Sequence, residues 1–456
     1  RRVVLLLGDL TATLAATLIS LYFWSIQDDY LDFSMRFLRE RIPGWFYLLP
    51  FIWLILLVEL YDLRRASRQR ETIQGLIIAA ATSLGLYLLV FFLSEQGSLP
   101  RLGVGIFILS TFLLTLFWRS IYLNVFTAPL FMRRVMIVGA GRAGSTLLQV
   151  VSEIWPPPFF LVGLIDDDEK KIGTKIENYP VLGGSDQLMK IIKDQNVTDL
   201  VFAISGEMNS QMFQALITAE EQGITVTTMP IIYEEVLGRV PIFLLQSDWI
   251  LRSFFDQIHA GDFFEFTKRL MDLLGGVIGV GIMILLFPLI SLGIALDSGF
   301  PIFYLQSRLG KNGNVYKIIK FRTMQQDAEI DGQARMATEN DGRVTRFGRF
   351  LRKSHLDELP QFINVLRGDM SLVGPRAERP QLVNELQKHI PFYRARLLVK
   401  PGLTGWAQIN YGYASTIEET GIKLEYDLYY IKHRNVMLDM SILLRTVGTV
   451  VGFRGQ

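Results

Sequence analysis

The chain of 456 residues contains no cysteine and four histidines. The absence of thiols excludes disulfide bonds, thiolate metal sites and a cysteine nucleophile. His259, His389 and His433 do not show the spacing of zinc ligands. His355 lies close to a pair of acids, but a histidine near the start of a helix is more often structural than catalytic, and we assign it the structural role.

A large net charge is also absent, because the chain carries +2 overall. The charge is unevenly distributed, however: residues 301–400 contain 18 Lys and Arg residues but 10 Asp and Glu residues. Such a basic region suits an anionic ligand or an anionic membrane surface. Nucleic acid is the rival partner, yet a basic region tethered to a membrane favours phosphorylated lipids and nucleotides, so we expect no nucleic-acid partner.

Long apolar stretches are present. Half of the residues are hydrophobic and the mean hydropathy is +0.30, which indicates that part of the chain lies in lipid. Residues 3–24, 45–61, 73–94 and 102–126 are apolar, and each stretch is near the roughly 20 residues that a membrane-spanning helix needs. Four such stretches in series predict an N-terminal four-helix transmembrane bundle over residues 1–130.

Arginines in excess of acids lie mainly on one side of the apolar stretches, whereas loop 25–44 mixes its three arginines with four acids. The arginines between the second and third stretch and after the fourth are Arg64, Arg65, Arg68, Arg70, Arg133 and Arg134. Cytoplasmic loops carry an excess of Lys and Arg, so both ends of the bundle are expected to face the cytoplasm.

A fifth apolar stretch, residues 273–296, contains no charged residue. A straight crossing would move the basic C-terminal region outside the cell, whereas activated phosphorylated substrates are made in the cytosol. Pro288 has no N–H for the carbonyl of Ile284, which predicts a kink midway. We therefore expect a re-entrant membrane helix near 270–297 that bends and returns to the cytoplasmic face. A kinked ordinary span is the alternative.

Residues 131–250 alternate strand and helix patterns and predict a Rossmann-like α/β domain. Gly139, Gly141 and Gly144 have the G-x-G-x-x-G spacing, and Asp166 follows at about the distance of a ribose-binding carboxylate. Nucleotide binding at these glycines is one interpretation. We favour the other, a domain that keeps the glycine turn and serves packing or dimerisation, because the remaining chain shows no hydride-transfer site.

Two adjacent acids, Asp357 and Glu358, lie in the basic region within "RFLRKSHLDELPQFINVL", which has helical periodicity. Successive helical residues point about 100° apart, so both carboxylates can serve one substrate without sharing a proton. Glycoside hydrolysis suits such neighbours poorly, because it needs carboxyl groups roughly 5–10 Å apart across a sugar ring. A metal-only site would recruit further acids, for which Asp369 and Asp427 are available.

Phosphoryl transfer fits the acid pair best, with one carboxylate attacking phosphorus, the other holding Mg²⁺, and arginines neutralising the phosphate oxygens. The non-functional alternative is an exposed acid pair that balances the neighbouring arginines.

The wider sequence resembles a known family, the long-form monotopic phosphoglycosyl transferases, or bacterial sugar transferases. These combine a four-helix bundle, a Rossmann-like middle domain and an α-rich monotopic catalytic domain, here residues 251–456. The motifs of the resemblance are "TKRLMDLLG", "KIIKFRTM", "HLDELPQFINVLRGDMSLVGPR", "KPGLTGWAQIN" and "KLEYDLYYIKH", in the family's order.

The resemblance implies transfer of a sugar 1-phosphate from a UDP-sugar to undecaprenyl phosphate with release of UMP, as the first membrane step of exopolysaccharide, capsule or O-antigen synthesis. Asp357 matches the nucleophile that forms a covalent phosphosugar intermediate, and Glu358 matches its partner in binding Mg²⁺. The positions that match the phosphate and nucleotide pocket are Lys320, Arg322, Arg352, Pro375 and Arg376, and Asp427 matches an acid near it.

The family also implies a location in the bacterial inner membrane with the catalytic domain on the cytoplasmic face, in contact with membrane lipids. A middle domain without an evident ligand suggests a homodimer. The chain departs from the family where Ala377 replaces the second proline of Gly-Pro-Arg-Pro, which loosens the claim that this proline shapes the loop. We expect Trp406 to act as an anchor at the membrane interface rather than to stack on a base.

Two other functions remain open at this stage. A NAD-dependent sugar-nucleotide dehydratase or epimerase would use the middle domain, but it needs a Tyr-x-x-x-Lys pair that the stretch from Tyr179 to Gly183 does not supply. A non-catalytic scaffold of a polysaccharide assembly complex would tolerate loss of the acid pair.

Overall fold

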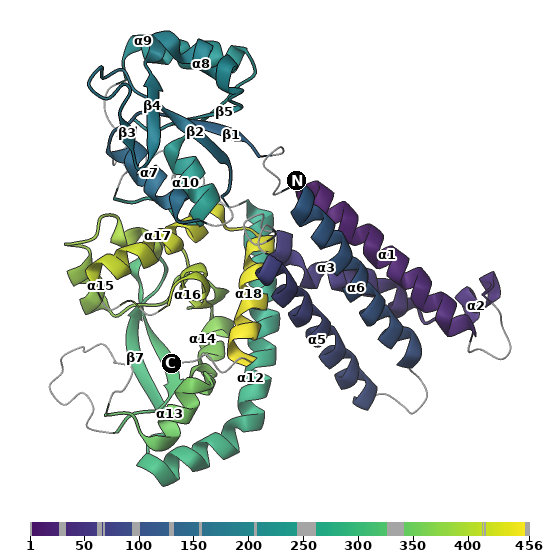
Figure 1. Ribbon diagram of the computed structural model, residues 1–456. Coiled ribbons are helices and arrows are strands. Elements are labelled where there is room, and N and C mark those ends of the chain that lie inside the picture. The colour runs from purple at the N-terminus through teal and green to yellow at the C-terminus, as the bar shows by residue number, and fades with distance from the viewer. Residues whose placement is uncertain are drawn as a thin grey trace. The chain divides into compact units, whose positions relative to one another are not determined.

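A computed structural model describes most of the chain, and it divides by contacts into two units, Arg1–Met229 and Pro230–Gln456 (Figure 1). The domain boundaries expected at residues 130 and 250 stay predictions. The described residues are 2–26, 33–61, 66, 69–93, 101–126, 132–154, 157–204, 208–243, 261–325, 342–412, 414 and 416–451.

Three long apolar helices dominate the N-terminal region: α1 (Arg2–Ile26), α5 (Gln69–Leu93) and α6 (Arg101–Phe126). Each is long and apolar enough to cross a membrane, which agrees with three of the four predicted stretches. Helices α1 and α6 pack against each other. Shorter elements lie between α1 and α5, namely α2 (Met35–Glu40), η1 (Gly44–Leu48), α3 (Leu49–Leu56) and η2 (Val58–Tyr61).

The expectation of one continuous spanning helix over 45–61 is wrong. This stretch begins as the 3-10 turn η1, continues as the eight-residue helix α3 and ends in a second 3-10 turn after Leu57. Pro50 lies in the first turn of α3, where its missing N–H costs no hydrogen bond. A proline deeper inside a helix would break the ladder, so regular α-helix cannot extend far before Leu49.

A charged pair that hydropathy did not reveal lies inside the helical bundle. The guanidinium of Arg119 on α6 donates to both carboxylate oxygens of Asp9 on α1, at 3.2 and 2.6 Å. Its third nitrogen donates to the carbonyl of Leu60 at 2.7 Å, and it lies over the ring of Tyr61. Both charged side chains are almost completely buried. Charges at such depth are costly unless paired, so this pair joins α1, α6 and η2.

The following region is a six-stranded sheet in the order β3-β4-β2-β1-β5-β6. Four of its five strand pairings are parallel, and the short edge strand β3 runs antiparallel to β4. Strands and helices alternate along the chain, as predicted for an α/β domain. The strands are β1 (Arg134–Val138), β2 (Phe160–Ile165), β3 (Lys175–Ile176), β4 (Tyr179–Gly183), β5 (Asp199–Phe202) and β6 (Thr225–Thr228), and the helices are α7 (Arg142–Ser152), α8 (Leu188–Gln195) and α9 (Ser210–Glu221).

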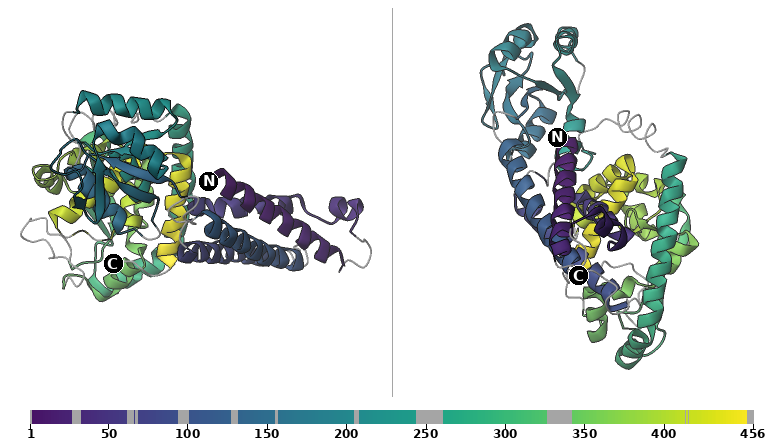
Figure 2. Two further views of the ribbon diagram at one scale, coloured as in Figure 1. Left: turned by 45° about the horizontal axis from the view of Figure 1, so that its top comes forward. Right: turned by 90° about the vertical axis from the view of Figure 1, so that its right-hand side faces the viewer.

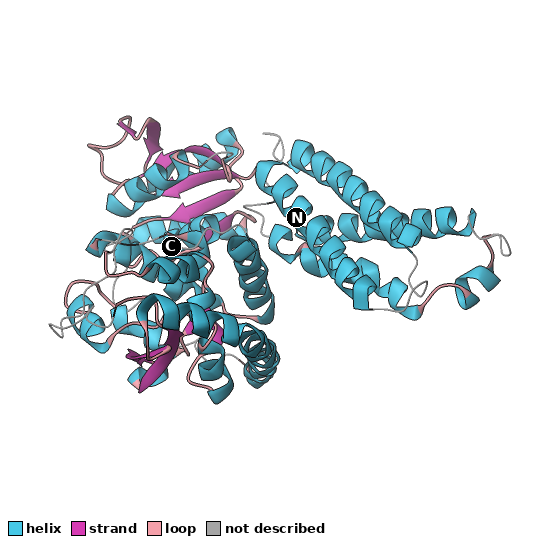
Figure 3. Cartoon of the chain, turned by 90° about the horizontal axis from the view of Figure 1, so that it is seen from below, coloured by secondary structure: helices cyan, strands magenta, loops and turns pink. Residues whose placement is uncertain are grey.

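Apolar residues of the sheet and its helices form a common core, because the central strands are buried along their length. Met136 and Val138 of β1 pack with Ile165 of β2 and Leu200 of β5, and Leu188 of α8 covers them. Figure 3 shows the strands in magenta, few in number against the cyan helices, so the chain is mostly helical.

The second unit is built on α12 (Asp262–Ser298), a helix of 37 residues with Pro288 inside it. Figure 1 shows that this helix changes direction toward its C-terminal end, and the right-hand view of Figure 2 shows its length. An internal proline removes one hydrogen bond and clashes with the preceding turn, which accounts for the bend. Exposed leucines and isoleucines cover much of the helix surface, including Leu285, Leu289 and Leu296. The predicted apolar helix with a central proline is therefore present.

The remaining elements of this unit are mostly short. They are α10 (Met229–Leu237), the antiparallel pair β7 (Phe303–Leu309) and β8 (Val315–Phe321), α13 (Arg346–Lys353), η6 (Leu356–Glu358), α14 (Gln361–Arg367), the parallel pair β9 (Ser371–Val373) and β10 (Gly402–Thr404), α15 (Pro380–Leu386), η7 (Tyr393–Leu398), α16 (Trp406–Asn410), α17 (Ile417–His433) and α18 (Val436–Val451).

Residues 230–243 are the first part of the second unit and pack against α16 and α17. Glu234 of α10 lies 2.8 Å from both Lys432 and His433. The indole N–H of Trp406 donates to the carbonyl of Gly238, and the N–H of Val240 donates to the carbonyl of Glu425. Trp406 is 3% exposed, so its expected role as an interfacial anchor is wrong. Its polar group is satisfied inside the protein instead.

Glycines of α12 allow α14 to approach closely. A Cβ on Gly279 would lie 2.2 Å from the ring of Phe362, whereas a Cβ on Gly281 would meet nothing within 4 Å. We expect Gly279→Ala to destabilise the protein by about 1–3 kcal/mol through overpacking. Gly281→Ala is the matched control and should be neutral or slightly stabilising, because alanine favours helix. Thermal unfolding in detergent measures both, and equal melting temperatures would contradict the packing.

Candidate active site

The acid pair lies on a turn between two helices. Helix α13 ends at Lys353, His355 takes a left-handed conformation with φ 56°, and Asp357 and Glu358 form the 3-10 turn η6. Helix α14 starts after Pro360. The periodicity over 349–366 suggested one helix, which is wrong, because a left-handed residue and a proline interrupt the hydrogen-bond ladder. The position of His355 agrees with the structural role assigned to it.

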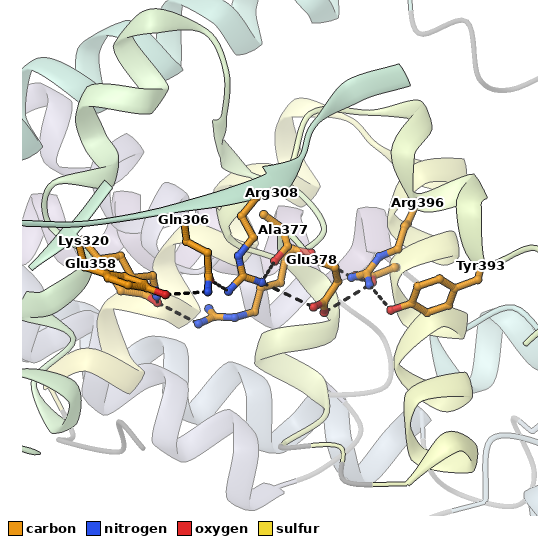
Figure 4. A network of polar contacts seen from close by, with 11 residues as sticks. Gln306, Arg308, Lys320, Glu358, Ala377, Glu378, Tyr393 and Arg396 are labelled. Carbon is orange, nitrogen blue, oxygen red and sulfur yellow. Dashed lines mark hydrogen bonds and ion pairs between the residues drawn. The ribbon is translucent and has the colours of Figure 1, made fainter. Parts of the chain in front are cut away.

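Glu358 is held by two cations. Lys320 Nζ donates to Glu358 Oε1 at 2.7 Å, and Arg376 Nη2 donates to the same oxygen at 2.9 Å (Figure 4). Lys320 comes from β8, and Arg376 follows β9 and bridges to Gly402. Burial acts to raise the pKa of Glu358, but Arg376 and Lys320 outweigh it, so the pKa lies well below its usual range. Glu358 is therefore a fixed anion.

Asp357 has a different environment. Its side chain is 8% exposed, and no described residue makes a hydrogen bond to its carboxylate. Burial raises its pKa, and Glu358 raises it further, against the opposing effect of Lys320, Arg352 and Arg376. One acid of the pair is thus firmly held and ionised, whereas the other has free oxygens and a raised pKa. That difference suits a division of labour between the two.

The predicted pocket residues do not all face the acid pair. Arg352 Nε donates to Thr323 Oγ1 at 2.9 Å, and its charge acts on Asp357. Arg322 instead donates to the carbonyls of Ser298 and Gly299 at the C-terminal end of α12. Lys320 lies near the end of β8 and Arg322 directly after it, yet the two side chains contact different groups. Two nitrogens of Arg322, Nε and Nη1, are buried and have no partner among the described residues.

A second polar cluster holds the backbone of Arg376. Arg396 of η7 donates to Asp427 Oδ2 at 2.8 Å and to the backbone carbonyl of Arg376 at 3.1 Å. Its other terminal nitrogen donates to Tyr393 Oη at 2.7 Å and to Glu378 Oε1 at 3.4 Å (Figure 4). Asp427 is 2% exposed. It therefore orients Arg396, which in turn fixes the chain at Arg376.

The loop before Arg376 is shaped by close backbone contacts. A Cβ on Gly374 would lie 2.4 Å from the carbonyl of Lys400, so only glycine fits. Pro375 lines a small pocket with Arg376, Leu309 and Pro401. The carbonyl of Ala377 accepts a hydrogen bond from Arg308 at 3.0 Å, so the loop is held although the second proline is missing.

The two acids are the metal ligands that the site offers. Within the described ranges, no group of three or more His, Asp or Glu side chains could hold a metal ion. Asp369 is bonded to Asn364, and Asp427 to Arg396, so neither joins the pair. This arrangement does not fit a metal-only site. It fits Mg²⁺, which usually takes one or two carboxylates and completes its shell with phosphate and water.

Asp166, the acid near the glycine loop of the sheet domain, binds groups of the protein itself. Asp166 accepts the N–H of Ala140 at 2.7 Å and the ammonium of Lys171 at 3.1 Å. Burial acts to raise the pKa of Asp166, but these hydrogen bonds lower it overall. Gly144 lies so close to Gly139 that a Cβ would reach its carbonyl at 2.1 Å. Asp166 thus supports the loop, and a nucleotide at Gly139, Gly141 and Gly144 stays a prediction.

The sequence analysis did not identify the charged residues that hold the loop around Arg376, namely Arg308, Glu378 and Arg396. A signal was present for one of them, because Arg396 is a charged residue within the apolar motif "FYRARLLV". Long charged side chains in such a setting are paired when buried.

Comparisons with known proteins agree with this geometry. Residues 263–453 match the family model described as bacterial sugar transferase, and residues 57–230 match one described as CoA-binding domain. The chain is 41% identical over 220 residues to a UDP-N-acetylgalactosamine-undecaprenyl-phosphate N-acetylgalactosaminephosphotransferase of Aeromonas hydrophila, covering 48% of this chain and 51% of that protein.

Two UDP-glucose:undecaprenyl-phosphate glucose-1-phosphate transferases are also similar. That of Xanthomonas campestris pv. campestris is 34% identical, with 60% of this chain and 57% of that protein covered. That of Caulobacter vibrioides is 38% identical, with 41% of this chain and 70% of that protein covered. The chain thus spans about half the length of the first two relatives and most of the third.

Proposed function

The chain belongs to the bacterial sugar transferase family, and from this premise we propose that it transfers a sugar 1-phosphate from a UDP-sugar to undecaprenyl phosphate and releases UMP. The relatives are named for this class of reaction with glucose or N-acetylgalactosamine. The observation that carries the proposal is the acid pair, in which Glu358 is held by two cations and Asp357 is free.

In the first step a carboxylate oxygen of Asp357 attacks the sugar-bearing phosphorus of the donor. A bond forms between this oxygen and phosphorus, and the bond from phosphorus to the bridging oxygen breaks. The electron pair leaves with UMP, and the sugar phosphate remains on Asp357 as an acyl phosphate. Lys320, Arg352 and Arg376 surround the pair and favour the charged phosphate oxygens.

In the second step an oxygen of undecaprenyl phosphate attacks the phosphorus of the acyl phosphate. The bond from phosphorus to Asp357 breaks, which regenerates the carboxylate and forms undecaprenyl diphosphate sugar. No proton has to be transferred in either step, so the site needs charge compensation more than an acid or base. Asp357 and Glu358 would hold Mg²⁺ together with the substrate phosphates. The ion would offset the negative charge of the donor phosphates, which otherwise repels the attacking carboxylate.

The test is UMP release by the full chain in detergent with undecaprenyl phosphate and a panel of UDP-glucose, UDP-galactose and UDP-N-acetylgalactosamine. We expect release with at least one sugar, dependent on added Mg²⁺ and, beyond one equivalent of enzyme, on the lipid. A correctly folded protein that releases no UMP from any donor would refute transferase activity and leave the scaffold role.

We also propose that α12 is re-entrant and that the chain lies in the inner membrane with its catalytic unit in the cytoplasm. The long apolar helices α1, α5 and α6 and the internal Pro288 of α12 support this. The interrupted segment η1–α3–η2 makes the fourth crossing in this proposal, because Phe46 packs on Trp24 near the end of α1 and the carbonyl of Leu60 binds Arg119, which pairs with Asp9 near the start of α1. Because the chain has no cysteine, single cysteines report topology directly. Val315 and Met437 are exposed on the catalytic unit, and Met35 is exposed between α1 and α3.

With an impermeant maleimide on intact spheroplasts, we expect Met35→Cys to be labelled and Val315→Cys and Met437→Cys to remain unlabelled until the cells are lysed. Labelling of both catalytic-unit cysteines from outside would show that α12 spans the membrane. The homodimer stays a prediction.

A further inference from the structure

Helix α17 places Lys423 one turn before Asp427. Lys423 lines a pocket beside Arg396, the residue that binds the backbone carbonyl of Arg376. The pocket is lined by charged and aromatic groups together with small residues of the preceding loop: Glu378, Tyr393, Arg396, Ala414, Thr420, Lys423 and Asp427. A small concave site with converging polar groups suits one polar group of a ligand.

The acids of this pocket already have cation partners. Arg396 binds both Asp427 and Glu378, and Arg308 lies 3.8 Å from Glu378. Glu358 is likewise held by Lys320 and Arg376. Lys423 differs, because it makes no hydrogen bond or ion pair with any residue in the described part of the chain.

Lys423 is partly buried, and burial lowers its pKa. The nearby cations Arg376 and Arg396 lower it further, while Glu378 and Asp427 act in the opposite direction. A desolvated ammonium without a bonded partner, close to another arginine, is unfavourable in the empty protein. An anion bound to Lys423 removes that cost, so the arrangement is preorganised for one.

Arg376 connects this pocket to the chemistry. Its guanidinium binds Glu358, and its backbone carbonyl is held by Arg396, which also binds Asp427 beside Lys423. The pocket therefore lies on the side of Arg376 away from the acid pair. The charge of Arg376 acts on both Asp357 and Lys423, so a donor whose sugar-bearing phosphate lies at Asp357 can bring its other phosphate toward Lys423.

We propose that Lys423 binds the phosphate of the nucleotide half of the donor, which leaves as UMP. This inference rests on the proposed function of the acid pair. As the bridging bond breaks, the leaving phosphate gains one negative charge, so a cation at this position stabilises the departing group more than the bound donor.

The test compares Lys423→Met, Lys423→Arg and Lys388→Met in the full chain. Lys388 is an exposed lysine on the surface and serves as the matched control. Equilibrium binding of UMP alone is measured by calorimetry, and KM and kcat are measured with the preferred UDP-sugar. One charged hydrogen bond is worth a factor of about 10 to 100 in binding. We expect this loss of UMP affinity in Lys423→Met together with a lowered kcat and a raised KM for the donor, partial recovery in Lys423→Arg and no change in Lys388→Met.

Thermal unfolding separates this role from a structural one. Because Lys423 has no bonded partner in the described part of the chain, Lys423→Met should melt at or above the temperature of the wild type. If Lys423→Met does not fold, Lys423→Gln takes its place in the same measurements.

UMP binding equal to wild type in a folded Lys423 variant would overturn the inference. A raised donor KM with unchanged UMP binding would also overturn it, because Lys423 would then contact the sugar. Absence of UMP release by the wild-type protein refutes the proposed function instead, and the UMP-binding comparison still decides the role of Lys423.

Discussion

Replacing Asp357 with asparagine should lower UMP release by about four to six orders of magnitude, the loss expected when a covalent nucleophile is removed. The amide cannot form the acyl phosphate, and no other carboxylate can replace it, because Glu358 is held by Lys320 and Arg376. The measurement uses a donor labelled in its sugar, without lipid acceptor, followed by denaturing electrophoresis. Wild-type protein should retain about one labelled sugar phosphate per chain, and Asp357→Asn none.

Two variants sharpen this result. Glu358→Gln should also be severely impaired, because it weakens Mg²⁺ binding and leaves Lys320 and Arg376 without their anionic partner. It should nevertheless retain a slow trace of label at high Mg²⁺. Asp369→Asn is the control, since Asp369 contacts Asn364 rather than the acid pair and should label normally.

Two outcomes would contradict the assignment. Persistent label on Asp357→Asn would move the nucleophile elsewhere. Turnover of the wild type without any labelled intermediate would indicate direct transfer between the two substrates.

Replacing Arg396 with methionine should destabilise the catalytic unit by about 3–5 kcal/mol, because it leaves buried charge without a partner. Arg396 is 5% exposed and is the cation that binds Asp427, which is 2% exposed. The substitution also releases the carbonyl of Arg376, so activity should fall with stability. Thermal and denaturant unfolding in detergent measure the change, and a melting temperature within about one degree of wild type would contradict the role of the pair.

The double variant Arg396→Met, Asp427→Leu is the control for this prediction. Removing both charges should cost less than removing Arg396 alone, because no unpaired carboxylate remains buried.

Acidification gives a second control for the Arg396→Met prediction. Burial raises the pKa of Asp427 above its unfolded value, so its protonated form is favoured in the folded protein and stability is gained as pH falls. Without Arg396 this pKa rises further, and the deficit of Arg396→Met should shrink at acid pH.

The amino-acid sequence was sufficient for the features that depend on short stretches. The long apolar helices α1, α5 and α6 lie where hydropathy predicts them, because burial in lipid depends on the composition of each segment. The alternation of strands and helices likewise predicted a parallel sheet. The adjacent acids Asp357 and Glu358, in a basic region, were enough to favour phosphoryl transfer.

The features that the sequence did not predict depend on residues far apart in the chain. Asp9 pairs with Arg119 across 110 positions, Arg396 with Asp427 across 31, and Trp406 with the carbonyl of Gly238 across 168. The energy of such a pair depends on packing and on the exclusion of water, and neither is encoded in the neighbouring residues. For the same reason the periodicity of the acid-pair segment, with helical residues on both sides of His355, did not reveal the turn in which Asp357 has no hydrogen-bond partner among the described residues and Glu358 is held by two cations.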